Sequence, residues 1–198
     1  MLQSSFSGQL IEAGCDEAGR GCLAGPVFAA AVILPAHFSN DLLDDSKKLT
    51  GRRRSMLRKV IQEQALAWAV GMVDNEMIDE INILKASFLA MHKALDHLHI
   101  KPQLILVDGN RFLPYRDIKH HCIIKGDGKF QSIAAASILA KTYRDEYMQQ
   151  LDKEFPEYGW SANKGYPTDK HRLAIRKYGL SPYHRLTFRS KDQIRIDF

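Results

Sequence analysis

The sequence has little cysteine, no long apolar run and no leader-like start. Its three cysteines are an odd number without a CxxC pair, which argues against a disulfide framework and favours free thiols in a reducing compartment. No apolar segment approaches the about 20 residues that a bilayer span needs. The first residues, MLQSSFSGQ, lack the basic start and apolar core of a signal peptide. We therefore expect a cytoplasmic protein without a membrane segment.

The sequence also has no internal repeat, no low-complexity tract and no convincing linker. Its 198 residues are therefore most simply one domain, long enough for a sizeable core. The formal net charge is +5, which favours a polyanionic partner without identifying one.

What the sequence does contain is a pair of adjacent carboxylates in front of a glycine-rich turn. Residues 10–15 and 27–34 are short apolar runs that predict two buried strands. Asp16 and Glu17 end the first run, and Gly19-Arg20-Gly21 follows them. The order predicts strand, catalytic turn and strand.

The side-chain alternation of a strand restricts how these two acids can act together. They can converge on one ion only if the chain leaves the strand between them, or if one acts from the turn. Gly19 and Gly21 would permit backbone angles and a close approach that larger residues prevent. Their amides could then lie against a phosphate or a sugar, with Arg20 alongside.

The same turn also fits the loose dinucleotide-binding fingerprint, Gly19-x-Gly21-x-x-Ala24. That fingerprint opens a helix, whereas Gly25-Pro26 and a segment rich in Val, Ile and Phe follow here and favour a strand. Two carboxylates before the loop would also repel a pyrophosphate. We disfavour this alternative, while a glycine turn with incidental acids stays open from this stretch alone.

Two further carboxylates follow apolar runs in a similar way. Residues 104–107 predict a short strand with Asp108 at its end, and residues 122–125 predict a strand followed by Gly126 and Asp127. Carboxylates at the C-terminal ends of strands line the usual ligand crevice of open α/β sheets. If these strands are neighbours, four carboxylates converge: Asp16, Glu17, Asp108 and Asp127. The contiguous His120, His121 and Cys122 would alternate across a strand, so we disfavour a zinc site there.

Periodicity and capping residues predict the other elements. They are a helix at residues 51–64 capped by Thr50, a strand at 65–73, a long helix from a cap at Asn75 to Leu98, a helix at 130–155, and a helix at 169–178 capped by Thr168.

Three polar residues share one stripe of the helix at 130–155, namely Ser137, Lys141 and Asp145. An ordinary ion pair between Lys141 and Asp145 fits this spacing, and so does a role for Ser137 and Lys141 beside a substrate backbone. Tyr166 lies in a glycine-rich aromatic segment, where it could stack on a sugar or base or pack within its own segment.

Several motifs extend the pattern of Cys15-Asp16-Glu17-Ala18-Gly19-Arg20-Gly21 along the chain. They are Ala24-Gly25-Pro26-Val27, Asp45-Ser46-Lys47-Lys48-Leu49, Val107-Asp108-Gly109-Asn110, Lys125-Gly126-Asp127, the run AAASILAK at 134–141, Arg144-Asp145 and Asn163-Lys164-Gly165-Tyr166-Pro167. Together, and in this order, they closely resemble the motifs of type 2 ribonuclease H enzymes, the bacterial ribonuclease HII group. The resemblance covers nearly the whole chain.

The resemblance implies a fold and an activity. The fold is ribonuclease H-like α/β, with a five-stranded mixed sheet flanked by helices and a C-terminal helical extension at about residues 158–198. The implied activity is hydrolysis of RNA in RNA–DNA hybrids and incision 5′ of single ribonucleotides embedded in duplex DNA. The ends would be 5′-phosphate and 3′-hydroxyl, and the implied roles are ribonucleotide removal from DNA and RNA primer removal.

Clustered carboxylates bind hard divalent ions through oxygen, so Asp16, Glu17, Asp108 and Asp127 are the candidate metal ligands. Two Mg²⁺ or Mn²⁺ ions at a scissile phosphate would activate water and stabilise the leaving oxygen. A bare cluster of four acids is repulsive, so we expect weak metal occupancy without nucleic acid.

The resemblance also implies substrate contacts. Gly19-Arg20-Gly21 would read the ribose 2′-hydroxyl, which separates RNA from DNA. Tyr166 would stack on the adjoining deoxyribose. Lys47 and Lys141 resemble residues that support the phosphate or the active site.

The last residues of the sequence predict one protein partner. Gln193, Ile196 and Phe198 fit the short peptides that bind sliding clamps, and a tail that only packs locally fits as well. We otherwise expect a monomer. Two other functions stay open: another two-metal nuclease or strand-transfer enzyme of this fold, and a non-catalytic nucleic-acid-binding module that uses the basic helix at 51–64.

Overall fold

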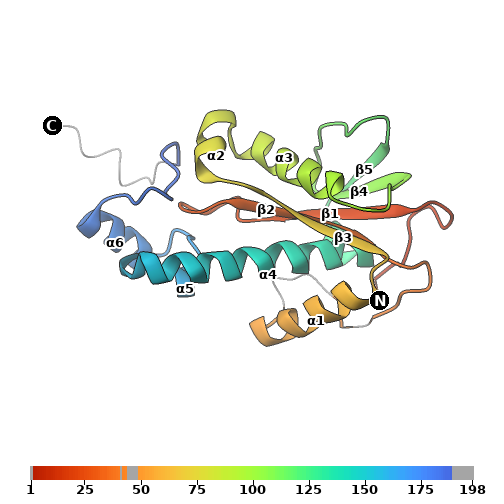
Figure 1. Cartoon of the computed structure of the whole chain (residues 1–198), viewed down its shortest axis with the longest axis horizontal. Coiled ribbons are helices and arrows are strands. Elements are labelled where there is room, and N and C mark those ends of the chain that lie inside the picture. The colour runs from red at the N-terminus through yellow and green to blue at the C-terminus, as the bar shows by residue number, and fades with distance from the viewer. Residues whose placement is uncertain (1, 41, 44–48, 189–198) are drawn as a thin grey trace.

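The computed structural model describes residues 2–40, 42–43 and 49–188, and its centre is a mixed β-sheet (Figure 1). Within these residues the sheet has five strands in the order β3-β2-β1-β4-β5. Antiparallel pairs join β1 to β2 and β2 to β3, while parallel pairs join β1 to β4 and β4 to β5. The expected mixed sheet is therefore confirmed. The strands are β1 (Glu12–Ala18), β2 (Val27–Ile33), β3 (Ala67–Val73), β4 (Leu104–Asp108) and β5 (Lys119–Ile123).

Helices cover both faces of the sheet (Figure 1). On one face lie α2 (Asn75–Ile81) and α3 (Ile83–Asp96), and on the other lies the long helix α4 (Gln131–Glu154). The remaining large helix, α1 (Gly51–Gln64), packs against α4 rather than against the sheet centre. In the described part of the chain, every helix falls short of the length or the apolar character that crossing a membrane requires.

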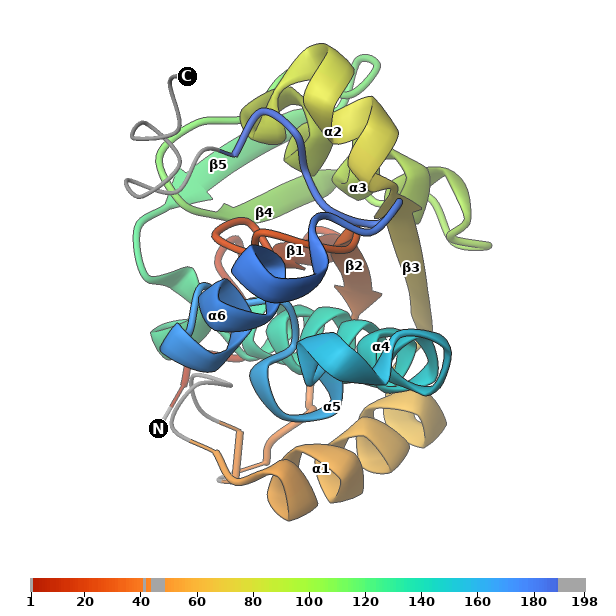
Figure 2. The same cartoon turned by 90° about the vertical axis from the view of Figure 1, so that its left-hand side faces the viewer.

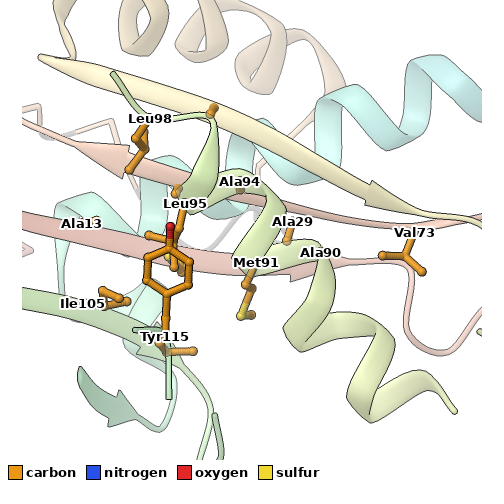
Figure 3. Close-up of a cluster of buried hydrophobic side chains, with 14 of the residues drawn as sticks. Ala13, Ala29, Val73, Ala90, Met91, Ala94, Leu95, Leu98, Ile105 and Tyr115 are labelled. Carbon is orange, nitrogen blue, oxygen red and sulfur yellow. The ribbon is translucent and has the colours of Figure 1, made fainter. Parts of the chain in front are cut away.

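Two buried clusters hold these layers together. Figure 3 shows the one between α3 and the sheet, where Met91 and Leu95 of α3 lie over small strand residues such as Ala13 and Ala29. The other cluster joins α4 and α1 to the opposite face. Small residues let α4 come close to β1: a Cβ on Gly14 would lie only 2.2 Å from the backbone carbon of Ser132. This contact fixes α4 directly against the strand that carries Asp16 and Glu17.

The C-terminal part of the described chain packs on the turn between β1 and β2. It contains two short elements, η2 (Pro156–Tyr158) and α5 (Trp160–Asn163), and the longer helix α6 (Asp169–Tyr178). Figure 2 shows this extension in front of the ends of β1 and β2. Backbone hydrogen bonds tie it to the turn, with the Leu23 N–H donating to the Gly165 carbonyl and the Gly25 N–H donating to the Tyr183 carbonyl, both at 2.8 Å.

Several predicted elements agree with the structure. The helices capped by Thr50 and Thr168 have the expected bounds, and each cap side chain accepts a backbone hydrogen bond from the first turn. A strand, not a helix, follows Gly25-Pro26, which removes the basis of the dinucleotide alternative.

Other boundaries were wrong. The first strand continues to Ala18, so both Asp16 and Glu17 lie on it rather than after it. The fifth strand lies at Lys119–Ile123, not at 122–125. The single long helix after residue 75 is two helices, because Asn82 has a φ of +69° and its side chain caps α3. The cap of α2 is Asp74, while Asn75 is buried and donates to the Pro182 carbonyl.

Candidate active site

The pairing register of β1 and β4 brings two carboxylates to the same level of the sheet. The last paired residues are Cys15 and Val107, so Asp16 and Asp108 are each the next residue along two parallel neighbours. Asp16 is 4 % exposed, and its Oδ1 accepts the Glu17 N–H at 2.7 Å. Asp108 Oδ1 accepts the Gly126 N–H at 2.7 Å. Backbone N–H groups therefore hold both side chains near the C-terminal ends of β1 and β4.

A cavity of about 190 Å³ opens over these carboxylates. Its walls combine the first strand, the glycine-rich turn, the fourth strand, α4 and the extension. The lining residues are Asp16, Glu17, Ala18, Gly19, Arg20, Gly21, Asp108, Ser137, Lys141 and Tyr166. Residues from four separate regions of the sequence thus line one space, and three of them are acids.

The electrostatics of the cavity favour a cation. Burial raises the pKa of Asp16 well above its usual value, and the nearby charges of Glu17 and Asp108 raise it further. The Ser137 hydroxyl hydrogen bonds to Asp16 and opposes that shift. A divalent ion would relieve the repulsion, and carboxylate oxygens are the ligands that Mg²⁺ and Mn²⁺ accept. The donor set therefore fits a hard divalent ion.

The carboxylates are not already gathered around a single point. Among the described residues, no three His, Cys, Asp or Glu side chains are grouped closely enough to hold a metal ion. This holds also for the segment with His120, His121 and Cys122, which lies on β5.

The two glycines of the turn at residues 19–21 differ in their steric environment. The backbone conformation requires glycine at position 19, whereas position 21 has room for a side chain. Gly19 has a φ of +101°, and a Cβ there would lie 2.0 Å from Arg144 Nε. A Cβ on Gly21 would meet nothing within 4 Å. Between them, Arg20 is half exposed, and its Nη1 donates to Glu17 Oε1 at 3.0 Å.

The opposite wall carries the polar stripe of α4 and one aromatic ring. Lys141 Nζ donates to Asp145 Oδ1 at 2.7 Å, so the ordinary ion pair is present while Lys141 also lines the cavity. Tyr166 is 39 % exposed, and its ring centroid lies 5.6 Å from Lys141 Nζ. Tyr166 therefore borders the cavity and keeps part of its surface exposed.

Some expected site residues stand apart from this group. Asp127 lies in the short 3₁₀ helix η1 (Gly126–Gly128), is buried, and is not among the residues that line the cavity. Lys47, Gln193, Ile196 and Phe198 lie outside the described residues.

Sequence reasoning missed two residues behind the turn, Arg144 and Arg185. Both are buried, and both donate to backbone carbonyls of the turn and its continuation. Arg144-Asp145 is one of the motifs of the resemblance, but nothing in the local pattern separates a buried arginine from a surface one.

Comparison with known proteins agrees with the motifs. The sequence model of the family described as Ribonuclease HII matches residues 13–191. A protein named Ribonuclease HII from Phocaeicola vulgatus is 62 % identical over 201 residues, which cover all of both chains. The ribonuclease H2 from Pyrococcus horikoshii OT3 is similar in structure, with a TM-score of 0.76, 29 % identity, and coverage of 92 % of this chain and 96 % of that chain.

A second solved structure contains a ribonuclease HII from Archaeoglobus fulgidus in a complex with PCNA. It has a TM-score of 0.74 and 27 % identity, and the match covers 92 % of this chain and 96 % of that chain. The matches over the full length of the sequence, the fold and the order of the motifs all point to one family. The chain belongs to the ribonuclease HII family of ribonuclease H enzymes.

Proposed function

We propose that this enzyme hydrolyses the RNA strand of RNA–DNA hybrids and also incises duplex DNA on the 5′ side of a single embedded ribonucleotide. The ends would be 5′-phosphate and 3′-hydroxyl. Family membership supports ribonuclease H activity on hybrids. One observation carries the finer proposal: three carboxylates share a cavity with the 19–21 turn and with Tyr166. The carboxylates that would hold the metal ions therefore line the same cavity as the 19–21 turn and Tyr166, which would contact the sugars.

Divalent metal ions fit the cavity by the chemistry of its donors, and Asp16, Glu17 and Asp108 would hold them. We propose two ions, Mg²⁺ or Mn²⁺, in the presence of substrate. When bound, such ions supply Lewis acidity at the phosphate and lower the pKa of water. Asp127 would be the fourth carboxylate ligand; it follows Gly126, whose N–H donates to Asp108, although it does not line the cavity.

The residues of the chain orient the substrate. Gly19, Arg20 and Gly21 would contact the ribose 2′-hydroxyl, which can both donate and accept a hydrogen bond. The ring of Tyr166 would stack on the sugar of the following deoxynucleotide, because Tyr166 lines the same cavity.

Phosphates on either side of the cut would contact positive charges of the cavity, among them the Lys141 ammonium. Ser137 would keep the Asp16 side chain in place by its hydrogen bond. We assign Lys47 to the same phosphate contacts from its sequence motif.

At the level of the whole protein, we propose a monomer in which residues 1–198 form one catalytic domain, with residues from about 158 as its extension. Its role would be removal of ribonucleotides from DNA and of RNA primers. Gln193, Ile196 and Phe198 would bind a sliding clamp; the similar archaeal ribonuclease HII was solved with PCNA. Clamp pull-down that survives Gln193→Ala together with Phe198→Ala would contradict this partner.

Incision of a DNA duplex that contains one ribonucleotide, with Mg²⁺ or Mn²⁺, tests the proposed activity. An all-DNA duplex and the Asp16→Asn variant are the controls. A nick immediately 5′ of the ribonucleotide, absent from both controls, is the expected result. Cleavage of long hybrid alone would keep the ribonuclease H activity and contradict the roles given to Arg20 and Tyr166. Binding without any cleavage would favour a non-catalytic module.

A further inference from the structure

Two arginine side chains are buried beneath the turn that follows β1. Arg144 of α4 is 0 % exposed and Arg185 of the extension is 2 % exposed. Burying a guanidinium is costly unless its N–H groups find acceptors. In this protein the acceptors are backbone carbonyls, and most of them belong to residues 19–26.

Arg185 holds the turn itself. Its Nη2 donates to the Gly19 carbonyl at 2.8 Å, its Nη1 to the Arg20 carbonyl at 3.0 Å, and its Nε to the Gly25 carbonyl at 2.9 Å. A trans peptide unit points its C=O and the next residue's N–H in opposite directions, and the described chain has no cis peptide bond. Holding the Gly19 and Arg20 carbonyls therefore directs the N–H groups of Arg20 and Gly21 away from Arg185.

Arg144 joins the same loop to the segment before Tyr166. Its Nε and Nη2 donate to the carbonyls of Pro26 and Ala24, at 3.0 and 3.1 Å, and its Nη1 donates to the Lys164 carbonyl at 2.8 Å. Its guanidinium carbon lies 6.0 Å from the Tyr166 ring centroid. Two segments about 140 residues apart in sequence are thus fixed to one planar group.

Only arginine offers this arrangement. A guanidinium presents five N–H donors in a rigid plane, whereas a lysine ammonium has three donors at one point. A lysine at either position would keep the positive charge but leave carbonyls without a partner. The pattern of acceptors is therefore a geometric requirement and not only a matter of charge.

We propose that Arg144 and Arg185 are positioning residues for ribonucleotide selectivity. Arg185 orients the amides of the 19–21 turn toward the sugar, and Arg144 sets the separation between that turn and Tyr166. The inference rests on the proposed function, because it assigns these two elements to the ribose and the next sugar. It predicts that loosening either arginine weakens the distinction between a ribonucleotide and a deoxyribonucleotide more than it weakens binding to duplex DNA.

The test measures that distinction directly. In an Asp108→Asn parent with Mg²⁺, which we expect to bind without cutting, the affinity is measured for a duplex with one ribonucleotide and for the same duplex made only of DNA. The affinity ratio is then measured after adding Arg144→Lys or Arg185→Lys. Asn75→Ala is the matched control, because it removes hydrogen bonds to the Pro182 and His184 carbonyls of the same extension without touching the turn.

The expected result is a fall in the affinity ratio of at least about ten-fold in each lysine variant and no change in the Asn75→Ala control. Thermal unfolding of all variants shows how much stability each has lost. An unchanged affinity ratio in a folded lysine variant would overturn the proposal and leave that arginine with a structural role only. If a lysine variant does not fold, Arg185→Gln, which keeps two amide donors, is judged by the same ratio. A parent that binds both duplexes equally would instead overturn the proposed function, and this inference with it.

Discussion

Arg20 Nη1 lies 3.0 Å from Oε1 of Glu17, so the cation of the glycine-rich turn neutralises one of the three acids in the cavity. The two residues are only three positions apart, one near the end of β1 and the other in the turn. It means that a cation entering the cavity meets a carboxylate that already has a partner. Arg20 therefore has two effects to separate, one on metal ions and one on nucleic acid.

Replacing Arg20 with alanine should strengthen metal binding and weaken cutting. Without the guanidinium, the Glu17 carboxylate loses this ion pair, and the cavity loses a positive charge that repels the metal ion. Because an exposed ion pair is worth about 0.2–1 kcal/mol, the affinity for Mn²⁺ should rise by a few-fold, to roughly five-fold at most. Calorimetric titration with Mn²⁺ in the absence of nucleic acid measures this gain.

The control for that experiment is Arg58→Ala. It removes an ion pair of similar length, Arg58 Nη1 to Glu146 Oε2 at 2.9 Å, from the groove between α1 and α4. Its Mn²⁺ affinity should equal that of the wild type. Equal or weaker Mn²⁺ binding by Arg20→Ala would contradict the competition between Arg20 and the metal.

Local sequence signals predicted much of the fold. The predicted caps Thr50 and Thr168 are confirmed, because side-chain capping depends on a few neighbouring residues. The apolar runs predicted strands beside Asp16 and Asp108 and a meeting of these acids if the two strands are neighbours. The parallel pairing of β1 and β4 meets that condition.

The remainder depends on distant contacts. The apolar stripe continues past Asn82, so periodicity alone predicted one helix, while the positive φ of Asn82 divides it into two. Arginine is rarely buried, so the burial of Arg144 and Arg185 had no sequence signal. The strand expected at 122–125 lies at Lys119–Ile123, and Asp127 lies in η1 rather than among the residues that line the cavity.

The two glycines of the turn should respond differently to alanine. Gly19→Ala forces a side chain into a φ of +101° and against Arg144, so it should cost on the order of 1–3 kcal/mol of unfolding free energy. Gly21→Ala has open space and should change stability by less than about 0.5 kcal/mol. Urea unfolding compares the two. If Gly21 is needed for close approach to the sugar, Gly21→Ala still slows incision at a single ribonucleotide. Wild-type incision by Gly21→Ala would show that the turn does not need that approach.

Asp108 and Asp127 should also differ. Asp108 lines the cavity and Asp127 does not, so Asp108→Asn should reduce turnover by about 10³-fold or more, an effect on the scale of losing a main electrostatic group. Asp127→Asn should cost at least about ten-fold less, because Asp127 lies outside the cavity lining, next to Gly126. Steady-state rates on a hybrid substrate at saturating Mg²⁺ measure both. Equal losses would place Asp127 among the direct ligands.

Within the extension, a chain of hydrogen bonds runs from Ser181 through two buried histidines to Tyr166, which lines the cavity. The Ser181 N–H donates to His184 Nδ1 at 2.9 Å, and His184 Nε2 lies 3.1 Å from His171 Nε2. His171 Nδ1 lies 3.0 Å from the Tyr166 carbonyl. The first bond makes His184 Nδ1 an acceptor, so its Nε2 carries the proton and donates to His171. The Tyr166 carbonyl can then receive the Nδ1 proton of neutral His171.

Acid should disrupt this chain. Burial lowers the pKa of His184 from 6.5 to about 4, with a further contribution from the charge of His171, and burial lowers the pKa of His171 as well. A lowered pKa means that the unfolded state binds the proton more readily. The contribution to stability is therefore present above pH 6.5 and is lost as the pH falls toward 4, and for His184 it amounts to on the order of 3 kcal/mol. Urea unfolding between pH 7 and pH 4 measures this loss. His184→Asn can still accept from Ser181 but cannot titrate, so its stability should fall less over this range. Parallel curves for the two proteins would contradict the assignment of the loss to His184.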